Sequence, residues 1–278
     1  LDQMITDKQG NIIGVPGYAG YLAFWVNQKI MDEAGVDKLD TKEDFEKYML
    51  AASKDGRYGY GGSWEKTYVF NEIAQFVNMF GGDYFDWTRP ENKEAIQFLY
   101  DMVQNKQTPI DQIADKYEQM NPKANDGKYG CWFMWGLGTD YEKAGMLGQD
   151  KIHMAMVPSM TDDGKRAIFT DSWSYVLNSS SKNKEAAIKF LKYMASEGGM
   201  EASYKYFDRY PARKDVAEKV VPDTDPAKEM YSRYASECNV QGRPMLPQTM
   251  EFITDMGTIY QSCMKGEISV DDFCKKAQ

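Results

Sequence analysis

The chain alternates short apolar runs with longer segments whose apolar residues recur at helical spacing. The short runs predict strands at residues 22–27, 129–135, 152–158 and 173–178. The preceding stretch VPGYAGY, residues 15–21, crowds tyrosines around two glycines and is expected to be a loop whose glycines serve turn geometry. Strands that alternate with helices are typical of an α/β fold.

Start signals accompany the predicted helices. Thr41 is followed three residues later by Asp44, the capping-box spacing, and opens a helix over 41–53. Pro90 stands in the first turn of a second helix, over 89–106. A third helix, over 181–196, carries one apolar stripe made of Ala187, Phe190, Leu191 and Met194. From Gly198 onward the chain is predicted to be mostly helical.

Composition narrows the classes of function. The 278 residues suffice for one large domain or two lobes. A formal net charge of −9 without long basic runs argues against a nucleic-acid surface. No stretch approaches the roughly 18 apolar residues of a membrane span, and no targeting signal is visible at the start, as expected if the chain is a fragment. The 19 tyrosines and 6 tryptophans suit a core, and they are also the residues that line sugar-binding clefts.

Catalytic and metal-binding patterns are weak in this sequence. His153 is the only histidine and lies in an apolar strand, which favours a structural role over that of a catalytic base. The cysteines have neither C-x-x-C spacing nor histidine partners, so no zinc site is expected, and we expect no cofactor. Acidic pairs such as Asp162–Asp163 are numerous, so a glycosidase that uses two carboxylates stays open as an alternative.

Five segments, in order, resemble family 1 extracellular solute-binding proteins of ABC importers, the maltose-binding-protein-like group. They are GVPGYAGYLAFWVNQKIMDEAGVDKLDTKEDFEKYM, NDGKYGCWFMWG, SSSKNKEAAIKFLKYMAS, YFDRYPARKDV and RPMLPQTMEFITDMGTIYQSCMKGEISVDDFCKKAQ. The resemblance implies an α/β fold of the periplasmic-binding-protein type II, with mostly lobe II and returning pieces of lobe I. Family members usually carry about a hundred more residues before this point.

The resemblance also implies a division of the chain. Residues 1–20 would be a remnant of lobe I and the first crossover, 21–164 lobe II, 165–197 a returning segment of lobe I, and 198–278 the helical C-terminal part of lobe II. With most of lobe I missing, we expect the chain to bind sugar far more weakly than a protein with both lobes.

By resemblance, the protein is the substrate-binding component of an ABC transporter. It would bind a mono- or oligosaccharide in the cleft between the lobes and deliver it to membrane permease subunits, outside the cytoplasm, in the periplasm or as a lipoprotein on the outer face of the membrane. It would not be an enzyme. Two alternatives stay open: a carbohydrate-active hydrolase with paired carboxylates, and a ligand-sensing module that docks on a receptor.

Candidate ligand-binding residues lie at crossovers, strand ends and loops that match the family's cleft. Aromatic rings can stack on sugars, while carboxylate and guanidinium groups can hydrogen-bond their hydroxyls. Each ring also has a packing interpretation. Trp132 and Trp135, three residues apart in one strand, should face opposite sides, so only one of them can face the cleft. The candidates are Tyr18, Tyr21, Trp64, Glu65, Tyr68, Trp135, Trp173, Tyr175, Arg209, Tyr210 and Phe252.

A disulfide is expected between Cys263 and Cys274. Residues 249–264 predict one helix and 269–276 a second, capped by Ser269, with a short turn between them. Such a helical pair can bring the two Cα atoms within the roughly 4.4–6.8 Å that a disulfide needs. A bridge from Cys263 to Cys238, or four free thiols, are the alternatives, and Cys131 is expected to be a small buried hydrophobe.

Overall fold

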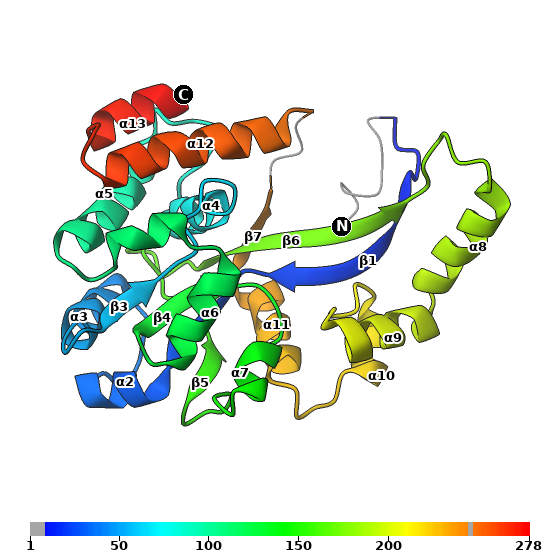
Figure 1. The fold of residues 1–278 in the computed structure, drawn as a ribbon, viewed down its shortest axis with the longest axis horizontal. Helices are drawn as coiled ribbons and strands as arrows, with labels where there is room; N and C mark the ends of the chain where they lie inside the picture. The colour runs from blue at the N-terminus through cyan, green and yellow to red at the C-terminus, as the bar shows by residue number, and fades with distance from the viewer. Residues whose placement is uncertain (1–8, 244–246) are drawn as a thin grey trace.

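A computed structural model describes residues 9–243 and 247–278 and contains two small sheets surrounded by helices (Figure 1). The four-stranded sheet has the order β3-β4-β2-β5, in which β4 and β5 run antiparallel to β2 and β3 runs parallel to β4. Every residue of β2 and β4 is buried, as their continuous apolar runs predict. The strands are β2 (Ala23–Asn27), β3 (Tyr58–Gly61), β4 (Tyr129–Met134) and β5 (Ile152–Ala155).

The second sheet has the order β1-β6-β7 and corrects two predictions. Its strands are β1 (Gly14–Tyr21), β6 (Ala167–Val176) and β7 (Asn239–Gly242). The expected loop at 15–21 is strand β1, which pairs antiparallel with β6 along its length. The strand expected at 173–178 begins instead at Ala167 and ends at Val176.

The glycines of β1 serve the close approach of two strands, not a turn. A Cβ on Gly17 would lie 2.8 Å from the Tyr175 ring and 2.9 Å from the carbonyl oxygen of Trp173 on β6. Only a residue without a side chain fits there. The pattern of apolar residues missed this strand because glycine and proline replace the β-branched residues that usually mark one.

Helices cover both faces of the four-stranded sheet, and their start signals are where the sequence predicts them. Thr41 and Asp44 form the capping box of α3, Pro90 is the first residue of α5, and Ser269 caps α13. The helices of this part are α2 (Gln28–Ala34), α3 (Lys42–Ala52), α4 (Phe70–Met79), α5 (Pro90–Gln104), α6 (Tyr117–Asn125), α7 (Thr139–Lys143), α11 (Pro226–Glu237), α12 (Thr249–Met264) and α13 (Val270–Ala277), with a 3₁₀ turn at Ile110–Ala114.

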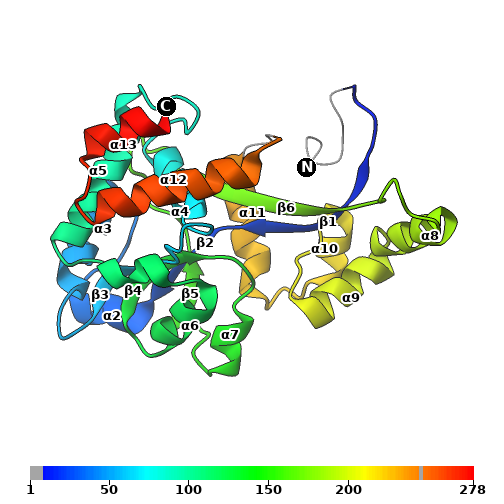
Figure 2. The same ribbon diagram turned by 45° about the horizontal axis from the view of Figure 1, so that its top comes forward.

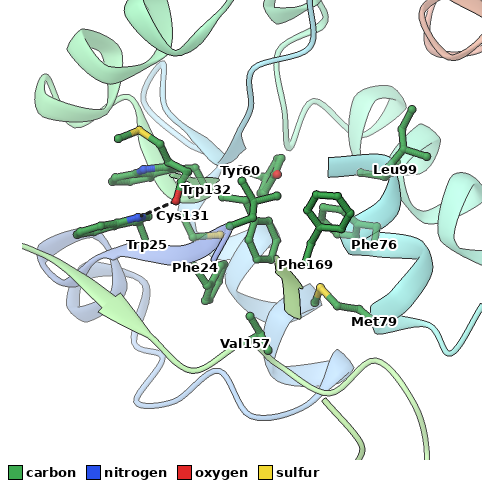
Figure 3. Packing of buried hydrophobic residues seen from close by; sticks show 14 of the residues in the cluster. Phe24, Trp25, Tyr60, Phe76, Met79, Leu99, Cys131, Trp132, Val157 and Phe169 are labelled. Carbon is green, nitrogen blue, oxygen red and sulfur yellow. Dashed lines mark hydrogen bonds between the residues drawn. The ribbon is translucent and has the colours of Figure 1, made fainter. Parts of the chain in front are cut away.

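Helix α4 is buried over its whole length and joins the two sheets. Its Gln75 side chain donates to the carbonyl oxygen of Ala167 at 2.9 Å and accepts from the backbone N–H of Phe169 at 2.7 Å, both on β6. Figure 3 shows the core beside it, where Phe76 of α4 lies near Tyr60 and Phe169. Because α4 is held between the two sheets, the loop before it, residues 62–69, has a rigid support.

Helices α8 (Lys184–Met194), α9 (Glu197–Phe207) and α10 (Lys214–Val220) lie away from the four-stranded sheet, beyond the β1–β6 pair (Figures 1 and 2). They contact one another, and α8 also contacts β1. The predicted helix α8 forms, but none of its residues is buried, so its apolar stripe is not a core face in the described structure. The expected lobe boundary at 197/198 falls inside this group, and the division into lobes stays a prediction.

The expected disulfide is absent, since all four cysteines are free thiols. Helices α12 and α13 do pack together, and Ser269 caps the second as predicted. Cys263 and Cys274 are buried there among apolar side chains and fill space as small hydrophobes, as Cys131 does in β4. Burial raises the pKa of the Cys263 thiol to about 12, which keeps it protonated and unreactive.

Alkylation without reductant tests the free thiols. In denaturant, we expect iodoacetamide to label all four cysteines. In the folded protein, the buried Cys131, Cys263 and Cys274 should react far more slowly than they do in denaturant, because their thiolates are scarce and covered. Mass spectrometry of the peptides reads both results. A linked peptide that contains Cys263 and Cys274 would contradict the structure.

Within the described ranges, no helix combines the length and the apolar character needed to cross a membrane. The same residues bring no three histidine, cysteine or acidic side chains together in a way that suits a metal ion.

Candidate functional site

A cleft of about 630 Å³ opens where the β1–β6 pair leaves the main body. Its walls come from nine regions of the sequence: β1, the start of α4, the start of α6, the turn after β4, β6, the end of α9, α11, the end of β7 and the start of α12. The lining residues are Tyr18, Ala19, Gly20, Thr67, Tyr68, Asn71, Lys116, Tyr117, Trp135, Gly136, Leu137, Asp171, Trp173, Asp208, Arg209, Tyr210, Tyr231, Arg243 and Met250.

One wall is an aromatic shelf made of Tyr18, Trp173 and Arg209. Tyr18 on β1 is the cross-strand partner of Trp173 on β6, and the two rings stack with centroids 6.1 Å apart. The Arg209 guanidinium lies 4.5 Å from the centroid of the Tyr18 ring, a cation–π contact. Trp173 is 56% exposed, so the shelf presents ring faces and a cation to solvent.

Trp135 forms the next part of the cleft, directly after β4. Its ring lies over Gly20, where an added Cβ would be 3.5 Å away, and packs against Phe169. Trp132, three residues earlier, is buried on the other side and donates from its indole to the Tyr141 hydroxyl at 2.8 Å. The two tryptophans therefore have the different surroundings that strand geometry predicts.

The floor of the cleft is polar. Arg243 lies 3.2 Å from the Asp171 carboxylate and donates to the Asn71 side-chain oxygen at 3.0 Å. The Asp171 side chain is only 13% exposed. Burial raises the pKa of Asp171 and the Arg243 charge opposes that rise. Such a pair offers hydrogen-bond acceptors and donors side by side, which suits adjacent hydroxyl groups.

The structure brings six of the eleven predicted site residues together. These six line the cleft: Tyr18, Tyr68, Trp135, Trp173, Arg209 and Tyr210. Three others lie beside it without lining it. Tyr21 packs edge-on against Tyr231, Glu65 accepts from the backbone N–H of Thr67 at 2.9 Å, and Tyr175 lines a second hollow next to α8.

Of the predicted stacking residues, Trp64 belongs to the protein interior and Phe252 lies partly buried against the core. Trp64 is 0% exposed, donates to Glu72 at 3.0 Å and meets Tyr260 edge-on, so its prediction as a cleft residue is wrong. Phe252 packs edge-on against Phe70 at the border of the core and does not line the cleft. Both predictions came from the resemblance to the family, and the partners that cover these rings, Tyr260 and Phe70, are distant in the sequence.

The sequence analysis missed the polar floor and several walls. One signal was available: Asp171 is a charged residue between apolar stretches of what is now β6. Nothing in the sequence pointed to Asn71 or Arg243, because their contacts form only where α4, β6 and the end of β7 meet. The missed lining residues with polar side chains are Thr67, Asn71, Lys116, Tyr117, Asp171, Asp208, Tyr231 and Arg243.

Known structures share this fold. Maltose-bound T. maritima MalE3 matches with a TM-score of 0.82 and 19% identity, over 99% of this chain and 73% of that one. A solute-binding protein from Thermotoga lettingae, solved with α-D-tagatose, matches with a TM-score of 0.82 and 22% identity, over 98% of this chain and 72% of that one. The Listeria monocytogenes protein Lmo0181, solved with cycloalternan, has a TM-score of 0.80 and 17% identity, over 100% and 74% of the two chains. The chain therefore has the α/β, type II periplasmic-binding-protein fold that the sequence predicts.

Sequence comparison agrees with the fold. The curated arabinooligosaccharide-binding protein of Halalkalibacterium halodurans is 28% identical over an alignment of 235 residues, and the match covers 78% of this chain and 51% of that protein. The chain thus spans about half the length of that relative. The family profile described as "Bacterial extracellular solute-binding protein" matches residues 1–201. Because this match covers more than half of the 278 residues, the chain belongs to the family of bacterial extracellular solute-binding proteins.

Proposed function

We propose that this chain is the ligand-binding part of an ABC importer's substrate-binding component and that its ligand is a carbohydrate. The observation that carries the proposal is the composition of the cleft. Stacked rings, Tyr18 on Trp173, stand over a floor where Asp171 and Arg243 are paired. Aromatic rings pack on the C–H faces of a sugar, and fixed charged groups hydrogen-bond its hydroxyls. The aromatic shelf and the polar floor therefore match the apolar and polar parts of one ligand.

The relatives support the same class of ligand. One is named for arabinooligosaccharides, and solved relatives carry maltose, tagatose or cycloalternan. We propose further that the protein works outside the cytoplasm, in the periplasm or anchored by a lipid, and hands its ligand to permease subunits. We also propose that it binds without catalysis, so an oligosaccharide should be recovered unchanged after incubation with the protein.

Removing either cleft tryptophan, the partly buried Trp135 or the exposed Trp173, tests the binding mode. We expect Trp135→Ala and Trp173→Ala each to weaken carbohydrate binding by roughly 1–3 kcal/mol, or about 5- to 150-fold, since each loses one large stacking surface. Calorimetric titration with arabino- and maltooligosaccharides measures the change. The fold should survive, because neither ring belongs to the fully buried core.

The matched control is Phe85→Ala. Phe85 is also an exposed ring, but it lies outside the cleft, so its loss should leave affinity unchanged. Unchanged affinity in both tryptophan variants would place the ligand elsewhere. If neither saccharide series bound the wild-type chain at millimolar concentration, the proposed function itself would fail.

A further inference from the structure

The cleft is lined by more cations than acids, whereas the chain as a whole is acidic. Three lining residues are cations, Lys116, Arg209 and Arg243, and two are acids, Asp171 and Asp208. The whole chain has 42 acidic against 33 basic residues and a formal net charge of −9. A protein of this charge repels anions from most of its surface, so a local excess of cations in the cleft favours a ligand of negative charge.

Arg209 is the arginine that the fold leaves without an acid. All seven arginines lie within the described ranges, and among them only Arg209 forms no ion pair there. The other six each pair with a carboxylate; they are Arg57, Arg89, Arg166, Arg213, Arg233 and Arg243. Because acidic residues are abundant in this chain, Arg209 is an exception, and its charge is available to a group outside the described chain.

The position of Arg209 leaves its donors open to a ligand. The guanidinium lies over the Tyr18 ring, 4.5 Å from the centroid, and that ring stacks on Trp173. A guanidinium over a ring face keeps its N–H groups at the edge, and no hydrogen bond within the described residues uses them. The neighbouring Asp208 carboxylate accepts from the backbone N–H of Leu137 at 3.4 Å. The open fork of N–H donors matches the two oxygens of a carboxylate.

Lys116 repeats this arrangement on another wall of the cleft. It directly precedes α6, and its ammonium group lies over the Tyr68 ring, 5.4 Å from the centroid. No ion pair of the described residues includes it. Glu65, an acid of the loop that carries Tyr68, accepts from the backbone N–H and the hydroxyl of Thr67 instead. Two walls of the cleft therefore each combine a tyrosine ring with a cation that has no acid partner.

We infer that the carbohydrate bound in the cleft is anionic and carries a carboxylate, as uronic acids do. Arg209 binds the carboxylate, while Tyr18 and Trp173 pack on the C–H face of the same sugar unit. Lys116 adds positive potential from the other wall. The inference rests on the proposed carbohydrate binding and names the chemical class of its ligand. A neutral sugar would use the rings and the polar floor and would leave both cations without a partner.

The test compares trimers of galacturonate, glucuronate and mannuronate with their methyl esters, which keep the shape of the sugar and lose the charge. Each is titrated by calorimetry into the 278-residue chain at low salt. We expect the preferred acid to bind about 5- to 30-fold more tightly than its ester, the gain from a charge-assisted hydrogen-bonded pair. Raising the salt from about 20 mM to about 300 mM should reduce this preference, because ions screen exposed charges.

Variants of Arg209 test whether this residue recognises the charge. The measured quantity is the dissociation constant of the ester divided by that of the acid, because lost stacking affects both ligands alike. Arg209→Gln should bring the ratio close to one, and Arg209→Lys should keep part of it, as a point charge without the fork. Lys205→Ala is the matched control. Lys205 also lies over a tyrosine ring, that of Tyr206, and has no ion pair within the described residues, but it does not line the cleft, so the ratio should stay within about twofold of the wild type.

The outcomes separate this inference from the proposed function. Equal affinity for acid and ester in all three series would overturn the inference, and so would a preference for the acid that Arg209→Gln leaves intact. Binding of neutral arabino- or maltooligosaccharides without binding of any uronate would overturn it as well. In each of these cases the proposed carbohydrate binding stands. Absence of binding to neutral and anionic saccharides alike would overturn both.

Discussion

Replacing Trp64 with alanine is expected to lower the free energy of unfolding by about 3–5 kcal/mol, the usual cost of removing a fully buried indole. The ring is 0% exposed and meets Tyr260 of α12 edge-on. Its Nε1–H donates to Glu72, and its backbone carbonyl accepts from Gln261 of α12 at 2.8 Å. Alanine leaves a cavity and removes the indole donor from a buried carboxylate. Urea unfolding followed by circular dichroism measures the loss.

Two comparison variants, Trp64→Phe and Trp135→Ala, separate the effect of burial from that of the hydrogen bond and a core ring from a cleft ring. Phenylalanine keeps most of the buried surface and loses the hydrogen bond to Glu72, so we expect a smaller loss of roughly 1–2 kcal/mol. Trp135→Ala should show the opposite profile to Trp64→Ala, with a large effect on ligand affinity and a small one on unfolding. If Trp64→Ala kept wild-type stability but lost affinity, the ring would belong to the cleft after all.

The sequence predicted those parts of the fold that depend on local signals. Thr41 and Asp44, Pro90 and Ser269 fix where helices begin through contacts within one turn, and all three starts are confirmed. The continuous apolar runs of β2 and β4 needed no partner to be recognised. Strand β1 could not be recognised in this way, because it pairs with β6, about 150 residues later. Its glycines are needed only because β6 approaches them closely.

The candidate site likewise contains residues that the sequence could predict and residues that it could not. Aromatic residues at crossovers, such as Tyr18 and Trp173, could be predicted because the order of motifs places crossovers near the cleft. The Asp171–Arg243 pair could not, because it joins two residues 72 positions apart on β6 and after β7. Trp64 was misassigned since nothing near it in the sequence shows that Tyr260 and Gln261 cover it.

Glu72 is the buried acid that ties the Trp64 loop to the core. From α4, one carboxylate oxygen accepts from the backbone N–H of Ser63 at 2.8 Å, and the other accepts from Trp64 at 3.0 Å and from the Tyr60 hydroxyl. A Cβ on Gly62 would lie 2.6 Å from the same carboxylate, so the loop closes on Glu72 without room for a side chain. The loop continues to Thr67 and Tyr68 in the cleft, so Glu72 supports the site indirectly.

Burial raises the pKa of Glu72 from 4.5 to about 7, against the opposing effect of its hydrogen bonds. Between these two pH values the unfolded chain releases the proton while the folded protein keeps it. The free energy of unfolding therefore falls as pH rises from about 4.5 to about 7. Above that range Glu72 is ionised in both states and contributes no further change. The full difference corresponds to roughly 3 kcal/mol.

Glu72→Gln should remove this pH dependence, because glutamine keeps the shape of the side chain and does not titrate. The unfolding free energy of the variant minus that of the wild type should therefore rise by roughly 3 kcal/mol from pH 4.5 to pH 8, as measured by urea unfolding at several pH values. Burial lowers the pKa of His153, so this group contributes a slope of the opposite sign. That slope is common to both proteins and cancels in the difference. Parallel stability curves for wild type and variant would show that Glu72 keeps an ordinary pKa, with its hydrogen bonds outweighing its burial.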